Sequence, residues 1–355
     1  EYAMKKIKSL FAIFPYYPIK MNQDLKRLWT ESLSSTSVKY KLLYRFSEVF
    51  IMVIKSLGIK FGQSKSRIFE FEILNDKKNE SDFLMQNKVV HLFQSGNPES
   101  IEIINDKLKF QNFCLQNHFP TPTKLGEIRS GKIYWDSEYP WFNNKSFIVK
   151  PTKGSQSKGI RDFVLSNEGR YIILDENREI SFSAVNDYLE HFIKQGEFII
   201  QERIMPGLEF LKIGIMSIPI LRIITISDDT NVKLLNPVMI INPEKNYLNS
   251  KLINKRFFAI DILNGRINHE IYFGKCSDGQ ILIKDFYIPD WEKIVELLIK
   301  AHKILNTVKI IGWDLGIGDG GFKIIEANKS PWIEIHQKFP FNAEGFQKEL
   351  LCLYK

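Results

Sequence analysis

The chain has 355 residues, enough for two or three domains, and its 44% hydrophobic and 25% charged residues are ordinary values for a globular protein. This composition excludes a fibrous or wholly disordered protein. Lys and Arg exceed Asp and Glu by 49 to 41, and the net charge of +8 suits anionic partners such as nucleotides, phosphosugars, lipid headgroups or nucleic acid. Cys114, Cys276 and Cys352 form no CxxC, so we expect neither a disulfide scaffold nor a cysteine zinc site. We therefore expect the protein to work in a reducing cytoplasm.

The first hundred residues say little about function. The start imitates a signal peptide, but its apolar run is only about five residues long, so we expect no export and take Met4 as the native start. No apolar run reaches the roughly 18 residues that a membrane-spanning helix needs. Apolar and basic residues alternate at helical spacing over 22–60, which predicts an amphipathic helix in a helix-rich region, residues 1–104. We expect this helix to cover a core, and peripheral contact with an anionic membrane is the alternative.

The middle and the end of the chain predict a strand-rich α+β fold. A helix over 106–117 ends at Pro120 and Pro122, because proline cannot continue a helix. β-branched and aromatic runs then predict strands at 147–150, 171–174, 198–201, 220–226, 238–242, 257–262 and 281–288, with helices at 183–195 and 290–305. We expect two α+β lobes, residues 105–200 and 201–345, with a hinge at 201–207 and a helix end at 346–355.

The most informative stretch is 310–328, in which a glycine-rich turn joins two apolar strands and so predicts a hairpin. Glu326 and Asn328 are two apart and share a face, and Asp314 lies at about the same height on the partner strand. Two carboxylates and an amide oxygen are hard ligands that suit Mg²⁺. The alternative is a solvated polar face, but acids inside apolar strands are poorly explained by packing.

Strand pairing adds a geometric expectation. Opposed residues in a regular hairpin project to the same face, so Asp314 should oppose Glu326 or lie one step diagonal to it. A two-residue turn at Asp319 and Gly320 would put Asp314 on the wrong face. We therefore predict a three-residue loop that also includes Gly321.

Three further segments carry polar chemistry. Lys150 ends a strand and precedes a loop rich in Gly and Ser, residues 151–159, which can fold over polyphosphate although it is no Walker A loop. Lys107 opens the helix over 106–117, where a surface lysine is the simpler interpretation. The strand at 198–201 runs into a polar turn whose backbone could pair with adenine, and it could equally be an ordinary strand end.

Together and in this order, these segments resemble the ATP-grasp superfamily, and more narrowly its sugar-transfer-associated group, over roughly residues 105–337. The most specific elements are Gly312-Trp313-Asp314, Glu326-Ala327-Asn328, Ile335-His336-Gln337 and Ile288-Pro289-Asp290-Trp291. The resemblance implies two α+β lobes that grip Mg-ATP between their sheets. It turns the metal, phosphate and adenine interpretations of the separate segments into one site.

The resemblance also implies individual roles. Lys107 and Lys150 would hold the ATP phosphates under a glycine-rich loop, with Gly154, Ser155, Ser157 and Gly159 as its contacts. Gln201, Glu202, Arg203 and Ile204 would form the adenine hinge, with a Gln201 or Glu202 side chain near the amino group. Asp314, Glu326 and Asn328 would bind Mg²⁺. Arg222 would stabilise the charge that develops during transfer, and an arginine among apolar strand residues needs an anionic partner in any case.

Two features depart from the group. Pro219-Ile220 replaces the usual Asn-Thr before the arginine, and residues 242–254 lack the usual Asp-Asn and Gly-Gly pairs. Lys251, Lys255 and Arg256 make this segment basic, which suits an anionic acceptor, and a solvated loop is the alternative.

The function expected from this resemblance is an ADP-forming carboxylate–amine ligase acting on a sugar acid or amino acid in surface polysaccharide synthesis. We expect ATP, Mg²⁺ and an anionic small molecule as partners, no nucleic acid, and a cytoplasmic location that includes the inner membrane face. A kinase that phosphorylates a sugar or a lipid-linked sugar is the nearest alternative. A basic module that binds polyanions or membranes would leave Asp314, Glu326 and Asn328 unexplained.

Overall fold

The computed structural model describes residues 90–93, 95–136, 145–154, 159–228, 230–242, 256–271, 283, 286–333, 335–337 and 348–350. The chain divides into two compact units, Glu1–Asp82 and Phe83–Lys355, and every described residue belongs to the second. The helix predicted over 22–60, and most of the helix-rich region predicted over 1–104, lie outside the described residues. No helix in the described ranges is long and apolar enough to cross a membrane.

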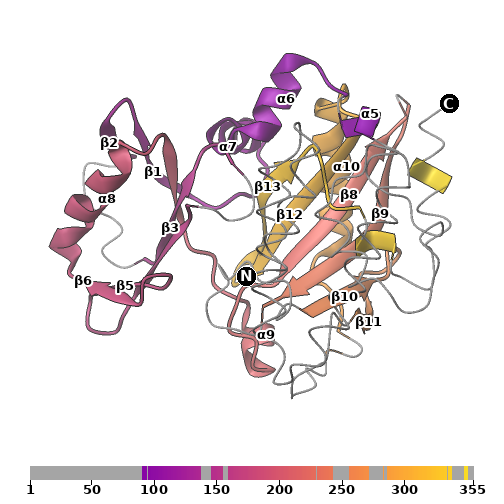
Figure 1. Cartoon of the computed structure of the whole chain (residues 1–355). Helices are drawn as coiled ribbons and strands as arrows, with labels where there is room; N and C mark the ends of the chain where they lie inside the picture. Colours follow the sequence, from indigo (N-terminus) through magenta and orange to yellow (C-terminus); the bar gives the residue numbers. More distant parts are fainter. Residues whose placement is uncertain are drawn as a thin grey trace, which may run out of the picture. The chain divides into compact units, whose positions relative to one another are not determined.

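The described part contains six α-helices and thirteen strands (Figure 1). The helices are α5 (Val90–Phe93), α6 (Pro98–Asn105), α7 (Lys107–Gln116), α8 (Val185–Ile193), α9 (Leu208–Lys212) and α10 (Trp291–Ile304). The strands are β1 (Lys124–Arg129), β2 (Lys132–Trp135), β3 (Phe147–Pro151), β4 (Arg161–Leu165), β5 (Tyr171–Ile173), β6 (Arg178–Ile180), β7 (Phe198–Glu202), β8 (Ile220–Ser227), β9 (Val232–Ile241), β10 (Arg256–Ile260), β11 (Ile267–Ile271), β12 (Ile310–Gly318) and β13 (Gly321–Asn328).

The first sheet, which we call sheet A, has the antiparallel strand order β2-β1-β7-β3-β4-β5-β6. Helix α8 packs on it through Val185, Leu189 and Phe192, whose spacing of three and four places them on one side of the helix. Beneath them the Phe147 and Phe163 rings stack with centroids 4.3 Å apart. This core fixes one face of sheet A and leaves the other face for the site.

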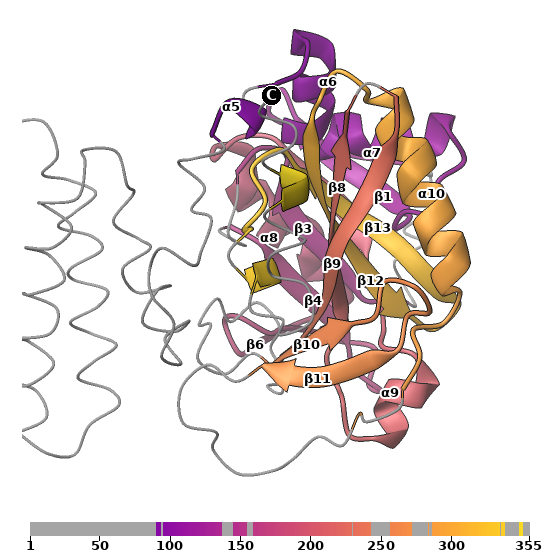
Figure 2. The ribbon, with the colours of Figure 1, turned by 90° about the vertical axis from the view of Figure 1, so that its right-hand side faces the viewer.

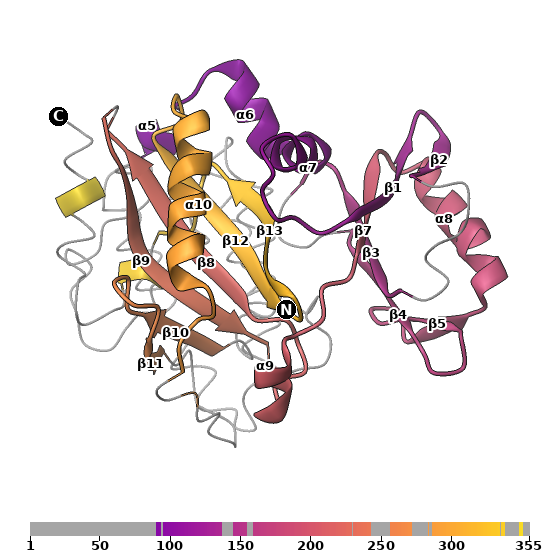
Figure 3. The ribbon, with the colours of Figure 1, turned by 180° about the vertical axis from the view of Figure 1, so that it is seen from behind.

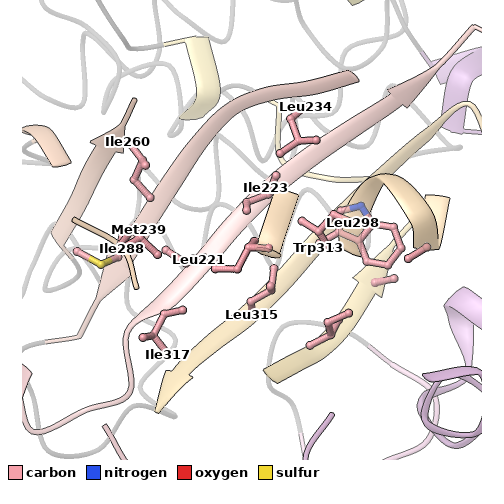
Figure 4. Close-up of a cluster of buried hydrophobic side chains, with 14 of the residues drawn as sticks. Leu221, Ile223, Leu234, Met239, Ile260, Ile288, Leu298, Trp313, Leu315 and Ile317 are labelled. Carbon is pink, nitrogen blue, oxygen red and sulfur yellow. The ribbon is translucent and has the colours of Figure 1, made fainter. Parts of the chain in front are cut away.

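The second sheet, sheet B, has the antiparallel order β11-β10-β9-β8-β12-β13, and α10 covers one of its faces (Figures 2 and 3). Ile294, Leu298 and Ala301 of α10 are fully buried at helical spacing against apolar residues of the strands. Figure 4 shows this core, in which Trp313 and Leu315 of β12 lie beside Leu221 and Ile223 of β8. Because alternate residues of a strand face opposite ways, Asp314 must face the other side.

The chain crosses between the sheets twice, and both crossings bond to the hairpin of β12 and β13. The first crossing, residues 117–123, leads from α7 to β1, and its Pro120 carbonyl accepts from the Ile324 amide at 2.8 Å. The second, residues 203–207, leads from β7 to α9, and its Met205 carbonyl accepts from the Asp319 amide at 3.1 Å. The hairpin is therefore tied to both connections.

The predicted α+β class is confirmed for the described residues, as are the helix over 106–117 and most of the strands. The strand predicted at 238–242 is the second half of β9, which begins at Val232. Of the strand predicted at 281–288, only 283 and 286–288 are described, and they contribute a single bridge between Arg266 and Tyr287. The helix-rich character of residues 1–104 stays a prediction.

Candidate functional site

Three charged residues form a row across β8, β12 and β13, the last three strands at one side of sheet B. Asp314 on β12 opposes Arg222 on β8 and, on its other side, Glu326 on β13. Arg222 holds the Asp314 carboxylate with two hydrogen bonds, Nε to Oδ1 at 2.8 Å and Nη2 to Oδ2 at 2.7 Å. Asn328 lies two residues beyond Glu326, and its Nδ2 donates to Glu326 Oε1 at 3.3 Å. The three predicted metal ligands therefore share one face with Arg222.

Asp314 opposes Glu326 as we predicted, but the turn and the pairing between them differ from our prediction. The turn has two residues, Asp319 and Gly320, and Gly318 opposes Gly321, so the predicted three-residue loop is wrong. From the turn to Leu315 and Ile324 the numbers of opposed residues add to 639, and from Asp314 and Glu326 onward they add to 640. A β-bulge at Ile325 makes this change and returns Glu326 to the face of Asp314.

Lys150 faces the row from sheet A. Its side chain is 5% exposed, and burial, together with the nearby charge of Lys107, lowers its pKa to about 8 against the opposing pull of Glu326. A lysine this deeply buried needs an anionic partner, because an uncompensated buried charge is costly. The charge of Glu326 acts on Lys150, and Lys153 and Gly154, which follow β3, line one pocket with Glu326 and Asn328 of β13.

Lys107 is tied to the base of the glycine-rich loop. Its backbone amide donates to the Thr152 carbonyl at 2.8 Å, and its Nζ donates to the Gly154 carbonyl at 2.9 Å. Gly154 and Gly159, which flank the loop, have φ values of +120° and +75° that favour glycine. Ser155 and Ser157, the other predicted loop contacts, lie outside the described residues.

A pocket of about 450 Å³ opens between these groups. Its walls combine apolar and charged residues: Ile104, Asn105, Lys107, Phe110, Lys153, Gly154, Glu326, Ala327, Asn328, Lys329 and Ser330. Lys153 and Lys329 were not predicted as site residues. Lys329 directly follows Asn328, and Lys153 precedes Gly154, so their positions beside the two motifs were the available signal.

The hinge side chains are engaged in different ways. The Gln201 side chain is 4% exposed, and its Nε2 donates to Gln111 Oε1. Glu202 accepts from the Thr123 amide at 3.0 Å and from Lys323 Nζ. Gln201 therefore lies buried in sheet A, whereas the Glu202 carboxylate links β7 to the first crossing and to β13.

The backbone amides of Arg203 and Ile204 differ in their hydrogen bonding. The Arg203 amide donates to the Ser146 carbonyl at 2.9 Å, and its side chain binds Asp162 at 2.8 and 3.1 Å. Burial raises the pKa of Asp162 to about 6, although Arg203 opposes this. The Ile204 amide has no hydrogen-bond partner within the described ranges, so it is the hinge donor available to a ligand.

Two glycines of β12, Gly316 and Gly318, let the hinge residue Ile204 pack closely against sheet B. A Cβ at Gly318 would lie 2.5 Å from Ile204 Cγ2 and 2.7 Å from the Met205 carbonyl oxygen. A Cβ at Gly316 would lie 3.2 Å from Ile204 Cδ1. The close approach of Ile204 to the strand therefore depends on these positions having no side chain.

The donor set fits Mg²⁺. No group of three or more His, Cys, Asp or Glu residues with metal-binding geometry occurs among the described residues. Mg²⁺ does not require one, because it commonly takes one or two protein carboxylates and completes its shell with phosphate oxygens and water. Asp314 and Glu326 could supply the carboxylates and Asn328 an amide oxygen, and each Asp314 oxygen keeps a second lone pair beyond its bond to Arg222.

The structure thus places the predicted residues in two groups. Lys107, Lys150, Arg222, Asp314, Glu326 and Asn328 surround the pocket and the charged row. Gln201 at the end of β7 and Ile204 in the second crossing form the other group, and the side chains of Glu202 and Arg203 bind Thr123 and Asp162.

The chain was compared with a family profile, with curated proteins and with solved structures. The sequence profile of a family described as sugar-transfer associated ATP-grasp matches residues 91–350. No curated protein matches the chain. Among solved structures, the ATP-grasp ligase PsnB in complex with a minimal precursor is 13% identical with a TM-score of 0.43, covering 73% of this chain and 63% of its own. The D-alanine–D-alanine ligase from Bacillus anthracis complexed with ATP is 13% identical with a TM-score of 0.41, covering 73% and 67%.

Proposed function

Because this chain belongs to the sugar-transfer-associated ATP-grasp family, we propose that it is a ligase that uses Mg-ATP to join a carboxylate to an amine. A carboxylate oxygen of the substrate attacks the γ-phosphorus, and ADP leaves. The amine nitrogen then attacks the acyl carbon of the acyl phosphate, loses a proton, and phosphate leaves. This reaction needs no protein nucleophile, only groups that position and neutralise charge.

The observation that carries the proposal is the charged row opposite Lys150. Arg222, Asp314 and Glu326 are held in register on three neighbouring strands. The charge of Glu326 acts on the buried Lys150 of the other sheet, and the residues that follow β3 share a pocket with Glu326. Packing alone does not explain four charged side chains at the meeting point of two apolar sheets. A polyphosphate with its divalent cation matches both signs of charge.

Each residue then has a defined task. Lys150 and Lys107 would bind phosphate oxygens, and the loop flanked by Gly154 and Gly159 would cover them. Asp314, Glu326 and Asn328 would hold Mg²⁺, which when bound neutralises the β- and γ-phosphates. Arg222 engages Asp314 through Nε and Nη2 only, so Nη1, which has no partner among the described residues, can donate to the transferred phosphoryl group.

The hinge would bind adenine. The Ile204 amide offers a donor to a ring nitrogen. Gln201 opposes Ile148 on β3, and Ile148 lies two residues from Lys150 on the same strand. The Gln201 and Lys150 side chains therefore share a face of sheet A. One nucleotide would extend along this face from the hinge to the charged row.

For the acceptor we propose an anionic substrate, a sugar acid or an amino acid used in surface polysaccharide synthesis. Lys153 and Lys329 add two cations to the pocket beyond the two lysines assigned to phosphate, and Ile104 and Phe110 give it an apolar wall. We propose that the enzyme works in the cytoplasm, at the inner membrane face when its acceptor is linked to a lipid.

Product analysis tests the proposal. Protein supplied with Mg-ATP and panels of amino acids and sugar acids should release ADP and free phosphate only when both substrates are present. Hydroxylamine should trap the acyl phosphate as a hydroxamate. Lys150→Met should remove the activity, and Lys132→Met, an exposed lysine of the same sheet, should retain it. Phosphate left on the acceptor without any hydroxamate would identify a kinase and overturn the ligase.

A further inference from the structure

A chain of side-chain amides runs from α7 to the hinge. Gln111 Nε2 donates to the Pro122 carbonyl at 2.8 Å, and Gln111 Oε1 accepts from Gln201 Nε2. The Gln111 and Gln201 side chains are 1% and 4% exposed. Both residues are therefore largely shielded from bulk water, so the protein contacts of their amides decide which way each amide points.

The Pro122 carbonyl fixes the direction of this chain. A carbonyl oxygen has lone pairs only, so the Gln111 atom that faces it must be the NH₂ group. Gln111 then presents its oxygen to Gln201, and a flipped Gln201 would bring two acceptors together. The orientation of the two amides follows from this network and needs no hydrogen position to be seen.

Gln201 Oε1 is consequently turned away from α7. Among the described residues nothing donates to this oxygen, and it is not one of the fully enclosed polar atoms without a partner. This oxygen therefore keeps some accessible surface and a free lone pair for a hydrogen-bond donor. Glu202, the other hinge acid or amide, is held by Thr123 and Lys323.

We propose that Gln111 is a positioning residue that fixes Gln201 as a hydrogen-bond acceptor and thereby makes the hinge select a 6-amino purine over a 6-oxo purine. The inference rests on the proposed nucleotide site. The adenine amino group donates to Gln201 Oε1, whereas the oxygen at position 6 of hypoxanthine or guanine would meet another acceptor. Without Gln111, the Gln201 amide is free to turn its NH₂ group toward a 6-oxo base.

The test compares the binding of ADP and IDP to the full chain with Mg²⁺, measured by calorimetry without turnover. The wild type should prefer ADP, and Gln201→Met should lower the ADP-to-IDP preference roughly tenfold or more, since an unpaired buried polar group is costly. Gln111→Met should lower it similarly, and the double variant should lower it no further. The hydrogen on hypoxanthine N1 is common to all variants and cancels from the comparison.

Two variants separate orientation from packing. In Gln111→Glu the new carboxyl group still accepts from Gln201 Nε2, so the preference for ADP should be retained even if stability falls. Gln116→Met, an exposed glutamine of the same helix, should change nothing. Gln111→Leu repeats the apolar replacement if Gln111→Met does not fold.

The outcomes are distinct. An unchanged preference in the apolar Gln111 variants, or an equal loss in Gln111→Glu, overturns the role of Gln111 while leaving the nucleotide site intact. Failure of the wild type to bind ADP overturns the proposed function itself.

Discussion

Asp314 lies between a cation and an acid, because Arg222 opposes it on β8 and Glu326 opposes it on β13. The two-point contact with the planar guanidinium fixes the rotation of the carboxylate as well as its charge. A metal ligand held in this way loses little freedom when a cation binds. Arg222 would therefore support the proposed metal site through Asp314, in addition to the contact with phosphate that we propose.

The first prediction concerns Lys150. Lys150→Met should weaken the binding of ADP with Mg²⁺ by more than tenfold, because a charge-assisted hydrogen bond to phosphate contributes roughly 1.5–3 kcal/mol. Stability should not fall, since the change removes a buried charge whose pKa is already lowered to about 8. Calorimetry gives the affinity and thermal unfolding gives the stability. Wild-type affinity in this variant would exclude Lys150 from the phosphate site.

The second prediction concerns the carboxylate at the end of the row. Glu326→Gln should reduce the affinity for Mn²⁺, used as a spectroscopic substitute for Mg²⁺, at least tenfold in the presence of ADP, because a neutral amide is a weaker ligand for a hard cation. Glu296→Gln, on the exposed side of α10 in the same sheet B lobe, is the matched control. Equal metal affinities in the two variants would remove Glu326 from the ligand set.

At the scale of elements, the hairpin shows what a sequence reveals and what it hides. The Asp314, Glu326 and Asn328 pattern predicted a shared face, and the pairing of Asp314 with Glu326 is as expected. The route was wrong, because Ile325 forms a bulge that nothing in the sequence marks. An isoleucine in an apolar strand looks the same whether it is paired or bulged, and only the packing of Ile324 and Ala327 into the core decides it.

His302 on α10 belongs to a buried network that links this helix to β12, the strand that carries Asp314. Trp313 Nε1 donates to Thr225 Oγ1 at 2.7 Å, the Thr225 hydroxyl donates to His302 Nδ1 at 2.6 Å, and His302 Nε2 donates to the Val308 carbonyl at 2.7 Å. Because the carbonyl can only accept, His302 must carry its hydrogen on Nε2. Every polar atom of the network is satisfied only while His302 is neutral.

The third prediction follows from this neutrality. Burial lowers the pKa of His302 to about 4, below the 6.5 of an unperturbed histidine, so below pH 6.5 the unfolded chain binds the extra proton first. The stabilisation is complete above pH 6.5 and should be lost as the pH falls toward 4, by at most roughly 3 kcal/mol. Urea unfolding at several pH values measures it. His302→Gln should flatten this slope, and an unchanged slope would contradict the assignment.

At the scale of the whole molecule, most strands were predictable because β-branched and aromatic runs are local signals. Contiguous motifs, as at Lys150 or 326–328, are what allow site residues to be proposed from the sequence. The roles of Gln111, Thr123 and Lys323 were not predictable, because they depend on contacts between segments 79 to 121 residues apart. The Glu202 carboxylate, for example, accepts hydrogen bonds from the first crossing and from β13, and its expected place near adenine stays a prediction.

The fourth prediction tests the close packing of Ile204 in the hinge against Gly318 of β12. Gly318→Ala should destabilise the fold by about 1–3 kcal/mol and weaken ADP binding, because its new Cβ would overlap Ile204 and the Met205 carbonyl. Ile204→Ala removes the side-chain part of the overlap, so the double variant should recover part of the stability but not all. Thermal unfolding and calorimetry measure both quantities. If Gly318→Ala leaves both unchanged, the hinge does not depend on this contact.

The fit between the hinge and β12 also constrains how this protein can evolve. Residues 204 and 318 are far apart in the chain, yet a larger side chain at residue 318 would require Ile204 to move or to become smaller. A hinge taken from a relative and grafted alone into this chain would meet a strand shaped for a different partner. The hinge and the hairpin have to fit each other, and we expect a functional chimera to require the exchange of both segments together.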